Sequence, residues 1–429
     1  MKVASIKGFR DVLPEEAANR RRVLEAARGV LERYRYGEIE LPFMEKVDLF
    51  SRAVGAASDI VEKEMYAFAD RDREATMIAL RPEGTASVVR AYLENGLARA
   101  MPVARLYYTG AMFRRERPQK GRYRQFSQIG AEFLGRDDPA ADAETLCLVA
   151  DIVKAAGIKD SRILLNSLGD KECRPAYRAE LAAYGKARID ELCEDCRNRV
   201  DRNPLRLLDC KVEGCRAAMA DAPLMIDNLC SACRTHHDRT LQLLAASGVE
   251  VTLAPRMVRG LDYYVRTAFE ITAPGLGSQD AVGGGGRYDG LVEVLGGPPT
   301  PGIGFAFGLE RLVLAAEASG ASTPATPVTR PDVFVAAVGD AASVVCAGLA
   351  RRLRAAGMTV ETDSPERRLK AQMKRADKSG ARWVAIIGDE ELARGAATVR
   401  DMTRNTDHEG LLPLNVSGAD AARILQGTD

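Results

Sequence analysis

The chain has 429 residues, enough for two to four domains. Hydrophobic residues make up 46% and charged residues 28%, a globular composition that excludes disordered, collagen-like and fibrous chains. Because 61 Lys and Arg balance 60 Asp and Glu, the net charge is +1, so any contact with nucleic acid must come from local basic patches.

The sequence carries no sign of a membrane span or an export signal. It has no run of about 18 apolar residues, and its start lacks the apolar segment of a secretory signal. We therefore expect a cytoplasmic protein whose nine cysteines are thiols or metal ligands rather than disulfides. The three histidines, His236, His237 and His408, form no catalytic constellation with a nucleophile, which disfavours Ser-His-Asp and Cys-His mechanisms.

The first part of the chain mixes helices and strands. Helical periodicity covers residues 14–35, with Pro14 at the helix start, and a short strand is expected at 37–42. Further helices are predicted at 85–95 and 140–156, and strands at 103–109, 125–134 and 162–168.

Residues 170–245 are polar and helical and contain most of the cysteines, so we interpret them as an inserted subdomain. Strand patterns return after it at 251–254, 268–272 and 281–283, and a strand running into a helix is predicted at 302–317.

A linker is expected at 318–331, where small, polar and proline residues dominate. Beyond it, apolar strands at 332–339, 358–363 and 383–389 are separated by helical stretches. Alternation of strands and helices predicts a separate α/β domain with a mostly parallel sheet.

The strongest chemical signal is a basic loop between the two strands at 103–109 and 125–134. Residues 114–124 hold six cations and one acid: Arg114, Arg115, Arg117, Lys120, Arg122, Arg124 and Glu116. So many like charges favour a polyanionic ligand, although a solvated basic hairpin is an equally simple interpretation. Phe126, Gln128 and Glu132 follow on one strand face, which suits a stacked base beside a small amine.

Four more segments combine chemical and structural interpretations. Two interpretations fit GLER at 308–311: its arginine contacts nucleotide phosphates, or its charged residues form an ion pair at a helix start. RPEGT at 81–85 includes Thr85, a candidate helix cap. RGLDYY at 259–264 is unusually rich in polar aromatics for a strand edge. VGGGGRYDG at 282–290 allows close backbone approach but matches no phosphate-loop motif.

Taken together, these segments resemble class II aminoacyl-tRNA synthetases. FRRER, a loop and RQF look like the second motif of the class, GLER like the third, and the strand at 37–42 after a long helix like the first, dimer-forming motif. RGLDYY and GGGRYDG resemble the segments specific to histidyl-tRNA synthetases. IKGFRDVLP and NPLRLLDCK extend the similarity to essentially the whole chain.

The resemblance implies an α+β fold in two parts and a homodimer. An antiparallel-sheet catalytic core would occupy 1–325, with a helical insertion at about 170–245, and a C-terminal α/β anticodon-binding domain would occupy 326–429. The implied activity is ATP-dependent ligation of L-histidine to its tRNA through a histidyl-adenylate, with release of pyrophosphate and AMP.

The same resemblance implies roles for individual residues. In ATP binding, Arg114 would meet the α-phosphate, Glu116 the adenine amino group, Phe126 and Arg311 the two adenine faces, and Arg122 the γ-phosphate, with Mg²⁺ on the phosphates. In histidine binding, Arg259 would lie beside the reacting carboxylate, and the other contacts would come from Glu83, Thr85 and Gln128 at the α-amino group, Glu132 and Tyr264 at the imidazole, and Tyr263 and Tyr288 in the wall. Arg259 and Arg114 would be catalytic.

Contacts with tRNA are implied in both parts. Gln119 and Arg124 in the basic loop would face the acceptor stem. A basic stretch in the C-terminal domain would contact phosphates through Arg367, Arg368, Lys370 and Lys374, although a solvated helix face explains the same pattern.

The cysteines of the insertion suggest a second kind of site. Cys193-x₂-Cys196 and Cys230-x₂-Cys233 form two CxxC pairs, and Cys210-x₄-Cys215 lies between them. Such pairs are typical of structural zinc, and the two CxxC pairs together would supply four ligands. Free thiols are the alternative, because the gap between the pairs exceeds the usual ribbon spacing.

Two other functions are alternatives to the ligase. A regulatory paralogue of the same fold would sense histidine without catalysis, but it would be expected to lose RGLDYY, the motif arginines or the C-terminal domain. A nucleic-acid-binding protein without ATP chemistry would not need the histidine-specific segments, and the neutral net charge also disfavours it.

Overall fold

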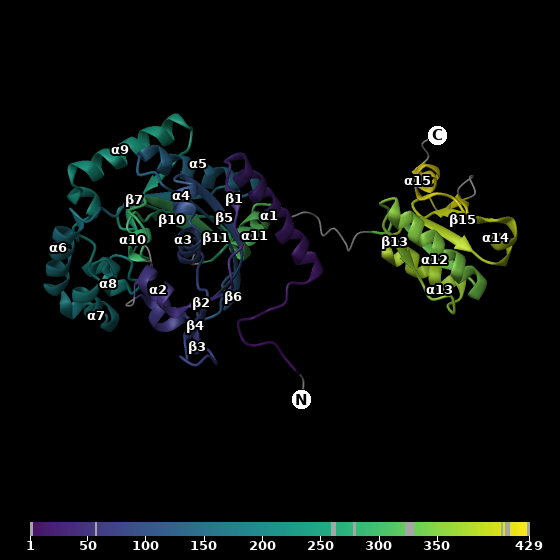
Figure 1. The fold of residues 1–429 in the computed structure, drawn as a ribbon, viewed down its shortest axis with the longest axis horizontal. Coiled ribbons are helices and arrows are strands. Elements are labelled where there is room, and N and C mark those ends of the chain that lie inside the picture. The colour runs from purple at the N-terminus through teal and green to yellow at the C-terminus, as the bar shows by residue number, and fades with distance from the viewer. Residues whose placement is uncertain are drawn as a thin grey trace. The chain divides into compact units, whose positions relative to one another are not determined.

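Two structural units make up the chain, Met1–Thr323 and Pro324–Asp429 (Figure 1). The computed structural model describes residues 3–55, 58–258, 263–277, 280–321, 330–404, 406–407 and 412–426. Most of the expected linker, at 322–329, lies outside the described residues. Within the described part, no helix is both long and apolar enough to cross a membrane.

An eight-stranded sheet forms the centre of the first unit. Its strand order is β1 (Gly37–Glu38), β5 (Ala104–Phe113), β6 (Gln125–Leu134), β11 (Gly302–Gly308), β10 (Ala281–Arg287), β9 (Val265–Thr272), β7 (Arg162–Ser167) and β8 (Thr252–Leu253). The six inner strands pair antiparallel, and only the short edge strands β1 and β8 pair parallel to their neighbours. The predicted antiparallel-sheet catalytic fold is therefore confirmed.

Alternate side chains of β6 show which face of this sheet packs in the core and which face lines a pocket. Ile129, Ala131 and Phe133 belong to a core that includes helices α1 (Pro14–Arg33), α5 (Pro139–Ala155), α9 (Ser231–Ala246) and α11 (Leu309–Ala318). Phe126 and Gln128, which have the opposite parity, line a pocket. The helices therefore cover one face, and the other face is open to a ligand.

A smaller element on the ligand side was not expected from the sequence. Strands β2 (Met44–Lys46), β4 (Met77–Leu80) and β3 (Tyr66–Ala69) form a three-stranded sheet beside α2 (Val47–Val54), a π-helical turn (Ile60–Glu64), α3 (Thr85–Glu94), α4 (Leu97–Ala100) and α10 (Leu291–Val294). These strands are too short to give a clear period-two pattern. The strand predicted at 37–42 is limited to Gly37–Glu38.

The insertion is helical, as predicted. Its elements are α6 (Arg174–Lys186), α7 (Glu194–Arg202), α8 (Glu213–Ala218) and α9, with 3₁₀ turns at Ile189–Glu191, Pro204–Leu207 and Met225–Asn228. It has its own core, in which Tyr177 and Leu181 pack with buried cysteines.

A network of buried charges joins the insertion to the sheet. Asp142 of α5 accepts hydrogen bonds from Arg287 at the end of β10, from His236 Nε2 of α9 at 2.8 Å, and from Thr267 of β9. The Asp142 and Arg287 side chains are fully buried. Burial alone would raise the pKa of Asp142, but the hydrogen bond from His236 and the charge of Arg287 hold it below its usual value.

The second unit contains a mixed sheet with helices on both faces. The strand order is β13 (Val360–Thr362), β12 (Val333–Ala337), β14 (Trp383–Ile387), β15 (Ala396–Asp401) and β16 (Thr406–Asp407), and β17 (Leu412–Pro413) also pairs with β15. The first three strands are parallel, as predicted, whereas β15 is antiparallel and was not predicted.

Four helices accompany this second sheet: α12 (Asp340–Ala355), α13 (Leu369–Ser379), α14 (Asp389–Arg394) and α15 (Gly418–Gln426). Val333 and Val335 pack in one core with residues of α12 and α15, and Phe334 and Ala336 pack with Ala376 of α13. Helices α12 and α13 therefore cover opposite faces.

Candidate active site

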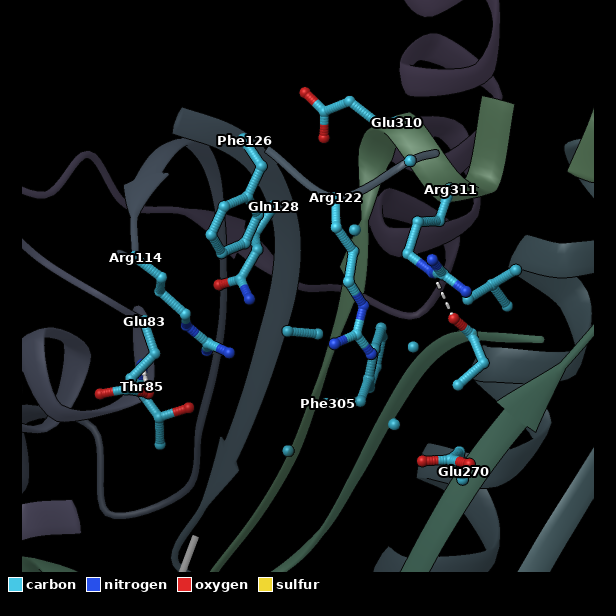
Figure 2. A pocket seen from close by; sticks show the side chains of 18 of the residues that line it. Glu83, Thr85, Arg114, Arg122, Phe126, Gln128, Glu270, Phe305, Glu310 and Arg311 are labelled. Atoms are coloured by element: carbon cyan, nitrogen blue, oxygen red, sulfur yellow. Dashed lines mark hydrogen bonds between the residues drawn. The ribbon is translucent and has the colours of Figure 1, made fainter. Parts of the chain in front are cut away.

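A pocket opens on the face of the large sheet opposite α1 and α5. Residues from β5, β6, β9, β10, β11, α3, α11 and the basic loop line it. Cationic, acidic and aromatic side chains all contribute to this lining, which suits a nucleotide beside a small amine. Figure 2 shows arginines from several elements pointing into the same space.

One side of the pocket is built by the basic loop. Arg114 Nη1 lies 3.8 Å from Glu116 Oε1, and Arg122 Nη1 lies 3.2 Å from Glu116 Oε2. The Arg114 guanidinium also lies 5.4 Å from the centre of the Phe126 ring and donates from Nε to Pro82 O at 2.8 Å. Glu116 therefore lies between two cations and offsets their mutual repulsion.

Helix α11 supplies the opposite side. Arg311 is buried, and its Nε donates to Ala281 O at 2.6 Å, so its guanidinium is held over β10 (Figure 2). Burial and the nearby Arg122 both lower the pKa of Arg311, which still leaves it protonated at neutral pH. The neighbouring Glu310 instead accepts from Ser127 N and pairs with Arg20 at 3.2 Å, so it forms the ion pair at the helix start.

A tight turn brings the basic loop against this helix. Gln119 and Arg122 exchange backbone hydrogen bonds around Gly121, which has φ of +72°. A Cβ on Gly121 would lie 3.1 Å from Leu314 and 3.4 Å from Arg311. A glycine is therefore required here by both the backbone angle and the close approach.

A chain of buried polar groups forms the inner wall. Glu83 accepts from the backbone N–H groups of Thr85 and Ala86 at 2.8 and 2.9 Å, so Glu83, and not Thr85 as the sequence suggested, caps α3. Thr85 Oγ1 donates to Glu132 Oε1 at 2.7 Å, and the Tyr288 hydroxyl donates to Glu132 Oε2. Burial raises the pKa of Glu83, and it raises that of Glu132 to about 8 against the opposing hydrogen bonds from Tyr288 and Thr85.

The Glu132 carboxylate lies behind the residues that line the pocket. Its space comes from Gly304 on the neighbouring strand, since a Cβ there would lie 1.8 Å from Glu132 Oε2. Both oxygens already accept a hydrogen bond, but each carboxylate oxygen has two lone pairs. The group can therefore take one further donor without losing Thr85 or Tyr288.

Aromatic side chains and an unpaired acceptor complete this end. Tyr263 lies edge-on to Tyr264 and Tyr288, with ring centres 4.7 and 5.8 Å apart. Gln128 Oε1 is buried and has no hydrogen-bond partner among the described residues. A buried acceptor without a donor is costly, so this atom favours a ligand that brings an N–H group.

The structure brings most of the predicted binding residues into one pocket, although they come from distant parts of the chain. Two of them are exceptions: Glu132 lies behind the pocket lining, and Arg259 lies outside the described residues. The lining residues that were not selected from the sequence include Tyr108 of β5, which resembled an ordinary core residue, and Glu270 of β9 (Figure 2).

The predicted tRNA-binding residues lie in two places. Gln119 is exposed in the basic loop, whereas Arg124 packs on Gly8 and donates to Lys7 O and Glu116 O at 3.4 Å. In the second unit, Arg367, Arg368, Lys370 and Lys374 are exposed at the start and along one side of α13.

The predicted four-cysteine set is wrong in its grouping. Cys193 and Cys196 meet Cys210 and Cys215, whereas Cys230 and Cys233 meet Cys173 and Asp170. The two CxxC pairs therefore belong to separate clusters. The spacing could not reveal this, because the fold of the intervening 33 residues decides which pairs meet.

Comparisons with known proteins agree with this architecture. The family model for histidyl-tRNA synthetase matches residues 8–312, and that for the anticodon binding domain matches 332–416. A histidine–tRNA ligase from Syntrophotalea carbinolica is 47% identical over 424 residues, covering 99% of both chains, and one from Anaeromyxobacter sp. is 50% identical over 402 residues, covering 94% of this chain and 95% of the relative. The crystal structure of apo S. aureus histidyl-tRNA synthetase superimposes with a TM-score of 0.80 at 34% identity, over 99% of this chain and 100% of that one.

Proposed function

Because the chain belongs to the histidyl-tRNA synthetase family, we propose how its pocket divides the family's reaction among its residues. The chain ligates L-histidine to its tRNA at the expense of ATP. The histidine carboxylate attacks the α-phosphorus of ATP and displaces pyrophosphate, and the terminal ribose hydroxyl of tRNA then attacks the histidyl carbonyl and displaces AMP. The full-length ligase relatives do not favour the regulatory alternative.

We assign ATP to the side of the pocket between the basic loop and α11. Arg114 would contact the α-phosphate and Arg122 the γ-phosphate, because guanidinium groups match phosphate oxygens in bidentate pairs. Phe126 and Arg311 would enclose the adenine, and Glu116 would accept from the adenine amino group. The observed pairing of Glu116 with both arginines supports an exchange in which phosphates take over the cations and release the carboxylate.

Four carboxylates of the described residues line the pocket, those of Glu83, Glu116, Glu270 and Glu310, and the Mg²⁺ that accompanies ATP could use one of them. This ion prefers oxygen ligands and commonly keeps one or two carboxylates besides substrate phosphates. Glu270 lines the pocket on the Arg311 side, so it is the residue we propose to hold the ion. Bound there, Mg²⁺ would offset phosphate charge.

Histidine would bind along the inner wall. We assign its α-ammonium group to Glu83, Thr85 and Gln128, an assignment supported by the unpaired buried oxygen of Gln128. The imidazole would lie among Tyr263, Tyr264 and Tyr288, with Tyr264 and Glu132 as its hydrogen-bond partners. A site of this kind rejects an isostere that lacks the ring N–H, because a buried polar group would be left unpaired.

Arg259 is proposed from the family resemblance to lie beside the reacting carboxylate and the α-phosphate. The attack brings two anions together, and charge increases further in the five-coordinate transition state. A fixed guanidinium would offset this repulsion without reorganising, as catalysis by charge stabilisation requires. Neither half-reaction needs a protein nucleophile.

The Glu132 assignment predicts a dependence on pH. Glu132 accepts an imidazole N–H as a carboxylate, and its pKa of about 8 means that lower pH protonates it. The kcat/KM for histidine should therefore rise between about pH 6.5 and 9, with a midpoint near 8. In Glu132→Gln this rise should vanish, and kcat/KM should fall roughly 10- to 150-fold, which corresponds to about 1.5–3 kcal/mol for a hydrogen bond to a charged group.

Steady-state kinetics across that pH range, with ATP KM measured in parallel, checks the prediction. Glu144→Gln, which changes a half-buried carboxylate paired with Arg105 outside the pocket, is the matched control. The substrate's own ionisation is common to all three proteins and cancels in the comparison. An identical pH profile in the parent and Glu132→Gln would remove Glu132 from imidazole recognition.

We propose that the second unit binds the anticodon arm through α13, and that Gln119 and Arg124 meet the acceptor stem. Lys370 and Lys374 lie one turn apart and are exposed, so both can reach phosphates. The double variant Lys370→Glu/Lys374→Glu should lower kcat/KM for tRNA at least about tenfold and weaken its dependence on salt. Activation of histidine should stay within twofold.

Helix α12 provides the control for this charge reversal. Arg351 and Arg354 are exposed on the opposite face of the same sheet, and Arg351→Glu/Arg354→Glu changes the charge by the same amount. Aminoacylation assays at two salt concentrations compare the two doubles. Equal losses in both would show that general charge, rather than the α13 face, governs tRNA binding.

We also propose a homodimer formed around the edge strand β1. Leu13 precedes α1, and Phe43 and Met44 follow β1; these large apolar side chains are 68%, 55% and 53% exposed. A twofold contact would bury them. Sedimentation should give about 93 kDa, twice the 46.5 kDa chain, and an active monomer at all concentrations would contradict the proposal.

The experiment that tests the function as a whole is ATP–pyrophosphate exchange with each amino acid in turn. Exchange should require histidine, and the same preparation should charge histidine tRNA. Exchange without charging would indicate an adenylating enzyme with another acceptor, and binding without exchange would indicate a sensor. Since its substrates are those of translation, we place the enzyme in the cytoplasm.

A further inference from the structure

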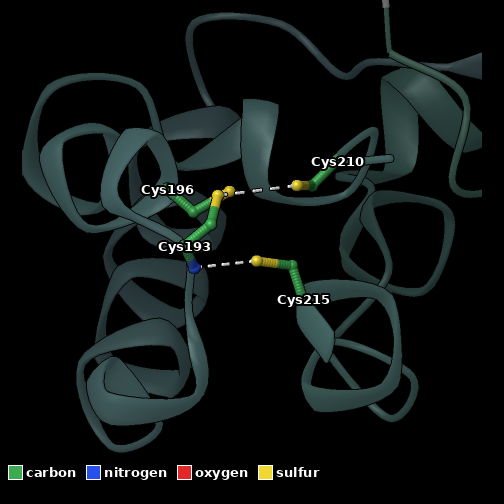
Figure 3. A group of neighbouring side chains, drawn as sticks. All are labelled: Cys193, Cys196, Cys210 and Cys215. Carbon is green, nitrogen blue, oxygen red and sulfur yellow. Dashed lines mark hydrogen bonds between the residues drawn. The ribbon is translucent and has the colours of Figure 1, made fainter. Parts of the chain in front are cut away.

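Four cysteines of the insertion meet at one point. Cys193 precedes α7, Cys196 lies in its first turn, Cys210 lies in the following loop, and Cys215 lies in α8 (Figure 3). Their four sulfur atoms all lie within 4.8 Å of one another, and Cys193 Sγ is 3.9 Å from Cys210 Sγ. Each sulfur comes from a side chain that is buried or half-buried.

This arrangement has the dimensions of a tetrathiolate metal site. With Zn–S bonds of about 2.3 Å, tetrahedral geometry puts the sulfurs about 3.8 Å apart. The observed separation of 3.9 Å between Cys193 Sγ and Cys210 Sγ is close to this spacing. We propose that Cys193, Cys196, Cys210 and Cys215 bind one structural zinc ion.

The surrounding structure supports a structural role. Helices α7 and α8 have nine and six residues, and the segment between them has only a 3₁₀ turn. Elements this short bury little apolar surface, and small folds commonly rely on a metal for the missing stability. The Cys193 backbone N–H donates to Cys215 Sγ at 3.0 Å, a contact of the type that orients a metal ligand.

Three further cysteines and an aspartate form a separate cluster. Cys173 Sγ lies 3.9 Å from Cys233 Sγ and 3.7 Å from Asp170 Oδ1, and Cys230 Sγ lies 4.0 Å from the same oxygen. A tetrahedral zinc site predicts about 3.8 Å between sulfurs and about 3.6 Å between sulfur and oxygen. From these distances, which do not depend on the first cluster, we infer a second zinc site with three cysteine ligands and one aspartate ligand.

The second site would lie between the start of the insertion and the start of α9. Asp170 and Cys173 follow β7, and Cys230 and Cys233 begin α9. Arg266 of β9 donates to Asp170 Oδ2 at 3.3 Å, which leaves Oδ1 directed at the cysteines. A zinc ion there would link the start of the insertion to the start of α9, next to β9, the strand that follows Tyr264.

Zinc analysis of the full-length protein, purified without chelators, tests both sites. We expect about two zinc ions per chain by mass spectrometry. Cys210→Ser should remove one, Cys173→Ser the other, and the double variant both. Cys147→Ser and Cys346→Ser, which change the two cysteines outside the clusters, should leave the content unchanged. Zinc content unaffected by Cys210→Ser would overturn the first site, and content unaffected by Cys173→Ser would overturn the second.

A measurement on the unsubstituted chain keeps the proposal testable if these variants fold poorly. Of the nine cysteines, the two clusters take seven and leave Cys147 and Cys346. A thiol reagent should therefore reach at most two thiols until a chelator is added, and cobalt added to the chelated protein should give sulfur-to-cobalt charge-transfer absorption with intense tetrahedral bands. Thiol reactivity unchanged by chelator, with no such absorption, would overturn both sites independently of enzymatic activity.

Discussion

Replacing Asp142 with alanine should lower the free energy of unfolding of the first unit by about 3–5 kcal/mol, the cost of leaving a buried charge without its partner. Arg287 is fully buried and would lose the carboxylate, and Asp289, 2.8 Å away, would be its remaining ionic partner among the described residues. His236 and Thr267 would lose an acceptor at the same time. Denaturation followed by circular dichroism measures the change.

The chain supplies an internal control for this experiment. Its single tryptophan is Trp383, in β14 of the second unit, so tryptophan fluorescence reports the other unit. The fluorescence transition should therefore be unchanged in Asp142→Ala. The double variant Asp142→Ala/Arg287→Met should recover part of the loss, because it also removes the unpaired cation. A single variant as stable as the parent would show that the network contributes no net stability.

Arg114→Ala should reduce the rate of histidyl-adenylate formation about 10²–10³-fold, the loss seen when one well-placed charge-stabilising donor is removed. The Arg114 guanidinium is already fixed in the pocket by Pro82 O and Phe126. It therefore needs little reorganisation when phosphate charge develops. Single-turnover measurements separate this step from transfer of preformed adenylate to tRNA, which should suffer less.

Two further variants show whether the loss in Arg114→Ala comes from the Arg114 guanidinium itself. Arg114→Lys should recover only part of the rate, because an ammonium group cannot span two oxygens in a planar fork. Arg117→Ala changes an exposed arginine of the same loop and should leave adenylate formation within twofold of the parent. A loss below about threefold in Arg114→Ala, or an equal loss in Arg117→Ala, would mean that the loop acts through its overall charge.

The long elements of the fold were predictable because their patterns extend over many residues. Strand β6 matches its predicted bounds, which cover ten residues. Strands β2 and β4 were missed, because three or four residues give no readable period and Met44 and Met77 are exposed. Strand β15 was missed for a related reason: it begins with two alanines, which favour helices.

The site depended on a different kind of information. Residue patterns pointed to the basic loop and to the shared face of Phe126 and Gln128, and the family resemblance supplied the remaining assignments. Neither source found Asp142, because one carboxylate in an amphipathic helix looks like a surface residue. Its partner Arg287 lies 145 positions away in the sequence, and only the folded sheet brings them together.

Because Glu116 lies close to both Arg114 and Arg122, it affects which anions can bind to these arginines. An anion that reaches Arg114 or Arg122 competes with a carboxylate that is already in place, so a lone phosphate or sulfate exchanges one ionic contact for another and gains little. In the ATP arrangement proposed above, a triphosphate would engage both arginines at once while its base lay between Phe126 and Arg311. The Glu116 carboxylate would then compete more effectively with a single anion than with the complete nucleotide.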